Sequence, residues 1–416
     1  MSPRSLFRPY LSLFAVPGSL AFSLVGWLAR LPIPMIGLGT VLLVAGETGS
    51  YGLAGALSGA LALSFSVVSP QWARLTDRRG QSTVLRLQVS AYLVFGVAFA
   101  VAVIAGGPHW LWFLLAALTG ANSPNIGALV RARWAHALDG TARQTAFAYE
   151  AVVDEVVFVV GPPLVTLLAT LISPPAGYLS GLFIGVVGGF WFAGLGSSEP
   201  PVHAVDPTGP SRRAALLSPT ILVVAIVSVA MGAVFGAMDV VVVGFAQEGE
   251  ASASAGLALA VFALGSLVAG LVYGLVRLPG SLAARYIGCV VFFGLALQLL
   301  LVVGSLGVLI PVAFVAGLSI APALVSGTSL VEARVPRSAL TEALSWITTG
   351  LTLGVTAGSA LAGAAVDAWG AESAFAVPAV AAGMAGLLVV AGAPLLRRAR
   401  SVDEGAQPLP AGSSAG

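Results

Sequence analysis

Long apolar runs separated by short polar stretches make up almost the whole chain. In the first half the runs cover residues 11–45, 51–73, 84–106, 110–131, 144–172 and 177–197. In the second half they cover residues 217–246, 253–276, 286–304, 307–331, 340–366 and 372–396. Because a helix needs about 20 apolar residues to cross a bilayer, the pattern predicts an all-α membrane protein with twelve transmembrane helices.

Polar sequence interrupts this pattern at two places. One stretch lies between the sixth and seventh runs and contains several prolines, and the other, rich in Gly, Ser and Pro, follows the twelfth run. Such stretches favour linkers and disordered tails. We therefore expect a first bundle over residues 1–196, a linker over 197–216, a second bundle over 217–396 and a disordered tail over 397–416.

Composition narrows the class of protein further. The chain is 58% hydrophobic and only 9% charged, which leaves no room for a soluble catalytic domain beside twelve helices. The chain has no lysine and therefore no Gly-x-x-x-x-Gly-Lys phosphate loop. We expect no cofactor, no bound metal and no nucleic-acid partner. The three histidines fall in predicted loops: His109, His136 and His203.

The basic residues mark one set of helix ends. All 19 are arginines, and every one except Arg30 falls at or beyond that set of ends, whereas the opposite loops carry only acids. Loops rich in Arg normally stay in the cytoplasm. The asymmetry predicts that both termini are cytoplasmic, and we expect a multi-pass protein of the cell membrane.

Short matches relate the two halves of the chain. The sequence Val-Arg-Ala-Arg over residues 130–133 corresponds to Val-Glu-Ala-Arg over 331–334, and Gly-Leu-Ala occurs at both 52–54 and 256–258. Together they fit two pseudo-symmetric six-helix bundles. In that architecture a substrate site lies near the bilayer midplane, between two halves that move against each other.

The loop after the second run carries a more specific signal. Residues 73–82 read Ala-Arg-Leu-Thr-Asp-Arg-Arg-Gly-Gln-Ser. They resemble the signature loop of the major facilitator superfamily, Gly-x-Leu-Ala-Asp-Arg-x-Gly-Arg-Lys. The match keeps Leu75, Asp77, Arg78 and Gly80, and it departs from the pattern at Ala73, Gln81 and Ser82.

This resemblance implies a transporter fold and a gating role for Asp77, Arg78 and Gly80. In the superfamily the aspartate contacts the start of helix 11 and stabilises the outward-facing state, which here would place Asp77 near Thr341. A carboxylate near a helix N-terminus is electrostatically favourable. The alternative is a solvated charged loop that only sets the topology.

Charged residues inside the apolar runs are the strongest candidates for function, because they are costly there unless they are paired or face a cavity. Arg30 lies in the first run, and Glu150, Asp154 and Glu155 lie in the fifth. Glu150 and Asp154 share a helix face, and Glu155 is turned from them by about 100°. The resemblance makes helices 1 and 5 neighbours.

Arg30 could therefore pair with Asp154 or Glu155, and Asp239 of the seventh run could face it across a cavity. Such a pair is either structural or part of a proton relay, and we favour the relay.

Two further motifs are less specific. Gly161-Pro162 is similar to the helix 5 motif of superfamily exporters, and it predicts a kinked helix. The kink could serve export or merely shape the bundle. Asn122 and Asn125 lie in the fourth run, which lines the cavity in the superfamily, so each could contact substrate or form hydrogen bonds between helices.

These observations predict a secondary active transporter and no enzyme. It would work by alternating access, as a monomer in the lipid bilayer, and couple export of a small amphipathic molecule to proton entry. Proton-coupled uptake of a small solute is the main alternative. A multi-pass membrane enzyme would need reactive residues clustered in loops, whereas here the acids lie inside helices. A receptor on the same fold would leave the same sequence pattern.

Overall fold

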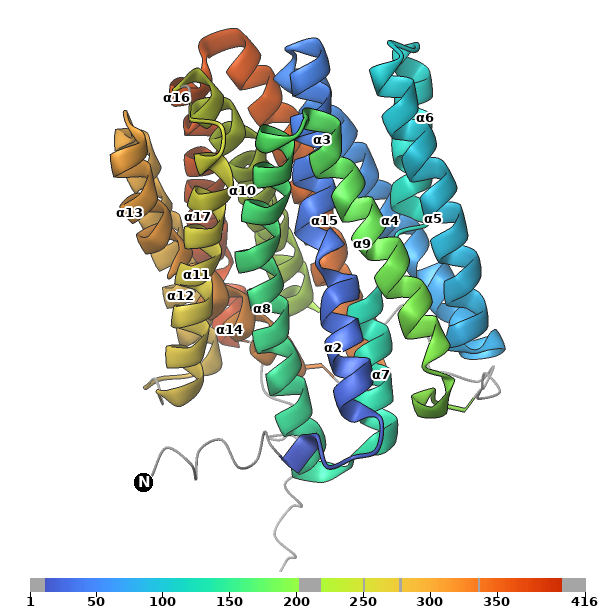
Figure 1. Cartoon of the computed structure of the whole chain (residues 1–416). Coiled ribbons are helices and arrows are strands. Elements are labelled where there is room, and N and C mark those ends of the chain that lie inside the picture. Colours follow the sequence, from blue (N-terminus) through green and yellow to red (C-terminus); the bar gives the residue numbers. More distant parts are fainter. Residues whose placement is uncertain (1–11, 202–217, 250, 277–278, 336, 399–416) are drawn as a thin grey trace, which may run out of the picture.

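The computed structural model describes residues 12–201, 218–249, 251–276, 279–335 and 337–398, and over this part of the chain it is built from helices (Figure 1). Twelve spans are long and apolar enough to cross a membrane. The predicted all-α architecture with twelve spans is confirmed. Most of the predicted linker and tail, residues 202–217 and 399–416, lies outside the described residues.

The first six spans comprise eight helices and a short 3-10 turn. They are α2 (Ser19–Arg30), α3 (Pro32–Thr48), α4 (Tyr51–Arg79), α5 (Gln81–Ile104), α6 (His109–Ala121), α7 (Ile126–Ala137), α8 (Gly140–Leu171), α9 (Pro174–Gly194) and η1 (Gly196–Ser198).

The last six spans begin after the undescribed segment. They are α10 (Pro219–Glu248), α11 (Ser254–Leu275), α12 (Leu282–Ala296) with η3 (Leu297–Val302), α13 (Leu306–Gly317), α14 (Ile320–Glu332), α15 (Arg337–Trp369), α16 (Ala371–Ala374) and α17 (Ala376–Arg398).

Several spans predicted as single helices are broken. The first span breaks at Leu31, directly before Pro32, because proline has no N–H to donate and its ring crowds the carbonyl of the preceding turn. The fourth span breaks over residues 122–125, around Pro124, and the tenth breaks at Leu318 and Ser319. The predictions of continuous helices over residues 11–45, 110–131 and 307–331 were wrong at these points.

Other helices run further than their apolar stretches. Helix α4 continues through Asp77 and Arg78 to Arg79, and Gly80, at φ 87°, turns the chain directly into α5. Helix α7 likewise continues past Arg131, where the apolar run ends, to Ala137. Because charged residues fit a helix end that reaches the membrane surface, the apolar stretch underestimates the helix. The predicted gating loop is therefore mostly the last turn of α4.

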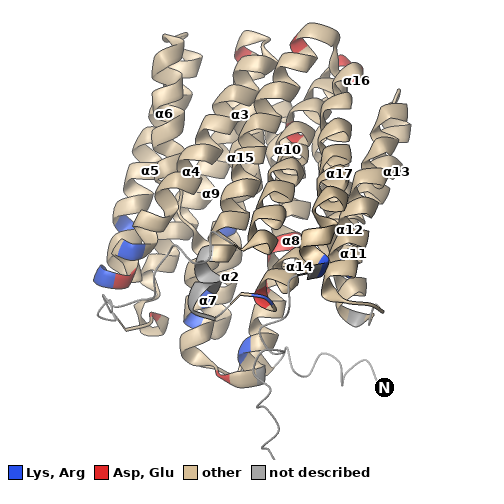
Figure 2. Ribbon diagram, turned by 180° about the vertical axis from the view of Figure 1, so that it is seen from behind, with Lys and Arg blue, Asp and Glu red and all other residues tan. Residues whose placement is uncertain are grey.

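Charge divides the bundle into two ends (Figure 2). One is the arginine-rich end, where blue bands gather in the figure. By their places near helix ends, its described members include Arg74, Arg78, Arg79, Arg86, Arg143, Arg285, Arg334 and Arg397. The other is the acidic end, with Glu47, Glu248, Asp367 and Glu372. That the arginine-rich end is cytoplasmic stays a prediction.

The repeated sequence motifs occupy matching positions in the two halves. Arg133 of α7 donates to the carbonyl of Leu195, just after α9, and Arg334, just after α14, donates to the carbonyl of Leu396 at the end of α17. Each arginine thus satisfies carbonyls at the end of the last helix in its own half. This correspondence is what a duplicated six-helix unit predicts.

The two halves pack closely at the acidic end. Here α4 lies against α15, and α11 lies against α8. A Cβ added to Gly256 of α11 would lie 2.6 Å from the carbonyl oxygen of Pro162. Glycines at such positions let the helix backbones approach each other directly. The second Gly-Leu-Ala motif therefore serves, like the first, as a contact between the halves.

Candidate functional site

A buried ion-pair network joins helices α2, α7 and α8 in the first half. Arg30 is the last residue of α2 and its side chain is 0% exposed. Its Nη1 donates to Asp154 Oδ1 at 2.7 Å, and its Nη2 donates to Glu150. The pairing compensates for removing the guanidinium from water.

Gly26 lets α2 pack closely against α7 beside the guanidinium. A Cβ added to Gly26, one turn before Arg30, would lie 3.7 Å from Arg30 Nη2. The same added atom would lie 2.6 Å from the side chain of Val130, so no larger residue fits there without displacing a neighbour. The break at Leu31 ends α2 at Arg30, facing the acids of α8.

The network extends from the buried pair toward the surface. Glu150 accepts a second bond from Trp134 Nε1 at 2.7 Å, and the other oxygen of Asp154 accepts from Arg131. Side-chain exposure rises from 0% at Arg30 and Glu150 to 32% at Asp154 and 37% at Arg131. Two arginines therefore face two carboxylates, and only the outer pair is accessible to solvent or a solute.

Glu155 points away from this network, as its offset around the helix predicts. It accepts a hydrogen bond from Ser266 Oγ of α11 at 3.3 Å, so it bridges the two halves of the molecule. Glu155 lies near the middle of the 32-residue helix α8. The second half therefore supplies part of what covers this carboxyl group.

Asp239 of α10 is partly buried and, among the described side chains, has no hydrogen-bond or ion-pair partner. Arg30 instead directs both terminal nitrogens to Glu150 and Asp154. Of the pairings considered for Arg30, the structure thus gives the one with Asp154, together with Glu150, and it gives neither Glu155 nor Asp239.

Sequence reasoning missed Arg131 and Trp134 as members of the network. The apolar run ends at Arg131, so the sequence pattern groups this residue with the arginines of the helix ends. Its position could have been found by noting that Trp134 and Arg131 lie three residues apart, on one face of a continued helix. The side chain of Arg131 then reaches Asp154 from α7.

The two asparagines of the fourth span make local bonds at its break. Asn122 Nδ2 donates to the carbonyl of Leu118 at 2.8 Å, within the end of α6. Asn125 accepts from the backbone N–H of Ala128 at 3.2 Å and so caps the start of α7. Neither bond links two spans. Contact of these residues with a substrate stays a prediction.

Gly161 and Pro162 lie inside α8, which is helical from Gly140 to Leu171. A Cβ added to Gly161 would lie 2.5 Å from Pro34 of α3, so the glycine permits close packing between the first and fifth spans. The kink that these residues predict stays a prediction, as does any part in export.

Asp77 and Arg78 are exposed in the last turn of α4. Among the described side chains, Asp77 has no ion-pair or hydrogen-bond partner. The side chain of Thr341, its expected neighbour at the start of α15, lies outside the described residues. The expected contact of Asp77 therefore stays a prediction.

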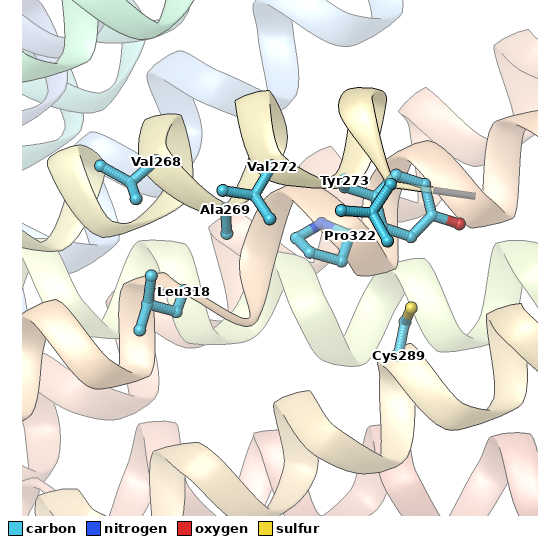
Figure 3. Close-up of a pocket in the computed structure, with 8 residues that line it drawn as sticks. Val268, Ala269, Val272, Tyr273, Cys289, Leu318 and Pro322 are labelled. Atoms are coloured by element: carbon cyan, nitrogen blue, oxygen red, sulfur yellow. The ribbon is translucent and has the colours of Figure 1, made fainter. Parts of the chain in front are cut away.

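An apolar pocket of about 320 Å³ lies in the second half, between α11, α12 and α14 (Figure 3). Tyr273 contributes a hydroxyl group and Cys289 a thiol to the lining. The figure shows side chains of α11 on one side of the pocket and Leu318 and Cys289 on the other. None of the charged candidates lines it. The lining residues are Val268, Ala269, Val272, Tyr273, Val276, Cys289, Leu318 and Pro322.

A twelve-span helical bundle with buried charges and close contacts between its halves defines a polytopic membrane fold. The family model of the Major Facilitator Superfamily matches residues 18–276 and 245–415. The chain therefore belongs to the Major Facilitator Superfamily. A search of curated proteins found no match to it.

Solved structures share this fold at low sequence identity. The nucleoside transporter NupG matches with a TM-score of 0.71 and 15% identity over 91% of this chain and 99% of its own. The peptide transporter POT matches with a TM-score of 0.71 and 14% identity over 92% and 96%. A bacterial homologue of the iron transporter ferroportin, in an inward-facing state, has a TM-score of 0.64 and 16% identity over 90% and 99%.

Proposed function

We propose that this chain is a secondary active transporter that works by alternating access and exports a small amphipathic molecule in exchange for protons. The contact between Glu155 and Ser266 carries this proposal. It places a carboxyl group in the middle of a span, at the contact between the two halves. Separating the halves at this point exposes the carboxyl group to water, and bringing them together covers it again.

Such a change of surroundings can drive proton binding and release. Covering a carboxyl group disfavours its charged form, and solvent exposure favours it. Glu155 would therefore take up a proton from one side and release it to the other as the halves move. The neighbouring network supplies a second set of groups, in which Asp154 is the acid accessible to a solute.

The charge asymmetry predicts the orientation of the protein in the membrane but not the direction in which substrate moves. The arginine-rich end is assigned to the cytoplasm, and protons enter most cells down their gradient. Export by exchange is favoured by the Gly161-Pro162 sequence, which is similar to the exporter motif. Uptake together with protons is the alternative. In export by exchange the substrate and the proton move in opposite directions, whereas in uptake they move in the same direction.

Proteoliposomes containing a pH-sensitive dye test the proposal. We expect the addition of a transported amphipathic compound to move protons in the opposite direction, and Glu155→Gln to abolish that movement. Glu47→Gln, an exposed acid at the acidic end, is the matched control. Movement of compound and proton in the same direction would establish the uptake alternative. Gradient-driven transport without any proton movement would overturn proton coupling.

A further inference from the structure

The start of α4 is capped by a residue of the other half. Asp367 of α15 accepts from the backbone N–H of Tyr51 through Oδ1 at 2.8 Å and from that of Gly52 through Oδ2 at 2.8 Å. Oδ2 also accepts from Ser50 Oγ at 2.9 Å. Ser50 Oγ in turn accepts from the N–H of Leu53.

The first turn of any helix has N–H groups without partners inside the helix. Here Asp367, directly and through Ser50, satisfies those of the first three residues of α4. A negative charge at this position is also favoured by the helix dipole. Because α4 and α15 belong to different halves, separating the halves at the acidic end removes this cap.

The backbones around this cap are in direct contact. A Cβ added to Gly55 of α4 would lie 2.1 Å from the carbonyl oxygen of Ser359, and one added to Gly363 of α15 would lie 2.1 Å from that of Tyr51. One turn further along, Thr356 Oγ1 donates to the carbonyl of Gly59 at 3.0 Å. At these glycines the backbones of α4 and α15 touch with no side chain between them, so no rotamer change there can absorb a displacement.

Asp367 and Asp77 occupy equivalent positions on antiparallel helices. Each lies three residues before a glycine with positive φ, Gly370 at 79° and Gly80 at 87°. In each case the glycine N–H bonds to the carbonyl of the residue just before the aspartate. Asp367 is bonded to the start of α4, whereas Asp77, at the opposite end of α4, is exposed and has no partner among the described side chains.

We propose that Asp367 is a latch that holds the acidic end closed by capping α4 from the other half, and that transport requires its release. This inference rests on the proposed alternating access. In the present structure the latch at the acidic end is made, and the corresponding aspartate at the arginine-rich end is free of described partners. The structure thus corresponds to a state closed at the acidic end.

Distances between spin labels on the two halves test the latch. Cysteines replacing Ile172 and Ser373, both exposed at the acidic end, are labelled in a Cys289→Ser background and measured in lipid nanodiscs. Asp367→Ala should lower the ratio of closed to open molecules about tenfold, the size expected for loss of a helix cap. Glu372→Gln removes one acid at the same end and should change the ratio less than twofold.

A second variant tests the latch through packing. Gly55→Ala adds a methyl group where the closed state leaves no space, so the open population should dominate even with Asp367 intact. Gly194→Ala, where nothing lies within 4 Å of the added carbon, is the control for helix substitution. Asp367→Asn removes the charge and keeps one acceptor, so its ratio should fall between those of the wild type and Asp367→Ala.

These measurements separate the latch from the transport function. Unchanged distances in Asp367→Ala and in Gly55→Ala would overturn the latch, even if the wild type moves protons and substrate. Shifted distances in both variants, in a protein that moves no compound tested, would support the latch and count against the proposed function. If Asp367→Ala does not give folded protein, the ratio of closed to open molecules is measured in Asp367→Asn, which is the milder change.

Discussion

At the scale of single residues, Arg30 and its partners dominate the energetics of the first half. Glu150 is fully buried between Arg30 and Trp134. Removing one partner of a buried ion pair leaves an uncompensated charge, which costs more than the pair itself contributes.

We expect Arg30→Ala to lower the free energy of unfolding by about 3–5 kcal/mol, because it leaves Glu150 buried with a single hydrogen bond. Adding Glu150→Gln should restore part of that loss. Arg131→Ala, which breaks the partly exposed pair with Asp154, should cost only about 0–1 kcal/mol. Thermal melting in detergent checks all three. Strictly additive losses in the double variant would contradict the pairing.

Asp154 and Glu155 are adjacent in sequence, but they have different surroundings and should have separable roles. Glu155→Gln keeps the hydrogen bond to Ser266 and removes the titrating proton, so we expect proton-driven transport to be lost and substrate exchange to continue. Asp154→Asn leaves two arginines facing one acid and should impair both activities. Counterflow and gradient-driven uptake in proteoliposomes distinguish the two. Wild-type driven transport in Glu155→Gln would remove this residue from coupling.

The charged candidates could be predicted from the sequence because a charge inside an apolar run is conspicuous. Their pairing could be predicted only in part. The spacing of Glu150 and Asp154 placed both on one face, as found. The second partner of Asp154 could not be seen, since Arg131 at a helix end resembles an arginine that merely sets topology. Asp367 was missed because an acid at a helix end resembles an ordinary solvated loop residue.

At the scale of helices, Arg133 stabilises the end of α9. It is 1% exposed, its Nη1 donates to the carbonyl of Leu195 and to Ser198 Oγ, both at 2.8 Å, and its guanidinium lies 3.9 Å from the ring centre of Phe192. Terminal carbonyls that would otherwise lack partners are thereby satisfied next to the membrane surface.

We expect Arg133→Gln to destabilise the protein by about 1.5–3 kcal/mol, the usual contribution of hydrogen bonds to a charged group. Hydrogen exchange should increase first at the end of α9 and in η1. Arg79→Gln, an exposed arginine at the same end, is the matched control and should change stability by less than about 0.5 kcal/mol. Equal melting temperatures for the two variants would contradict the capping role.

The number of membrane spans could be predicted from the sequence, but the points at which a span is interrupted could not. Twelve apolar runs of sufficient length determine twelve spans, because about 20 apolar residues form a helix that crosses the bilayer with its backbone hydrogen bonds satisfied internally. Proline breaks the helix in one span and not in another. The span with Pro32 is interrupted, whereas α8 continues as a helix through Pro162 and Pro163. The presence of a proline in the sequence therefore does not by itself locate a helix break.

At the scale of the whole molecule, the capping contact between the halves lies at the acidic end of the bundle. At the acidic end, backbone contacts and the cap by Asp367 join the halves. At the arginine-rich end, Asp77 is exposed. If transport occurs by alternating access, closure must pass from one end to the other, because a channel open at both ends would dissipate the gradient that drives transport.

The most direct measurement records both ends of the same molecule. One pair of spin labels replaces Ile172 and Ser373 at the acidic end, and a second pair replaces Thr83 and Ala284, both exposed at the arginine-rich end. Distances are measured in nanodiscs with and without a transported compound, and across a range of pH. We predict opposite changes: whenever the distance at the acidic end increases, the distance at the arginine-rich end decreases. Distances that increase together, or that stay fixed while the compound is transported, would contradict alternating access.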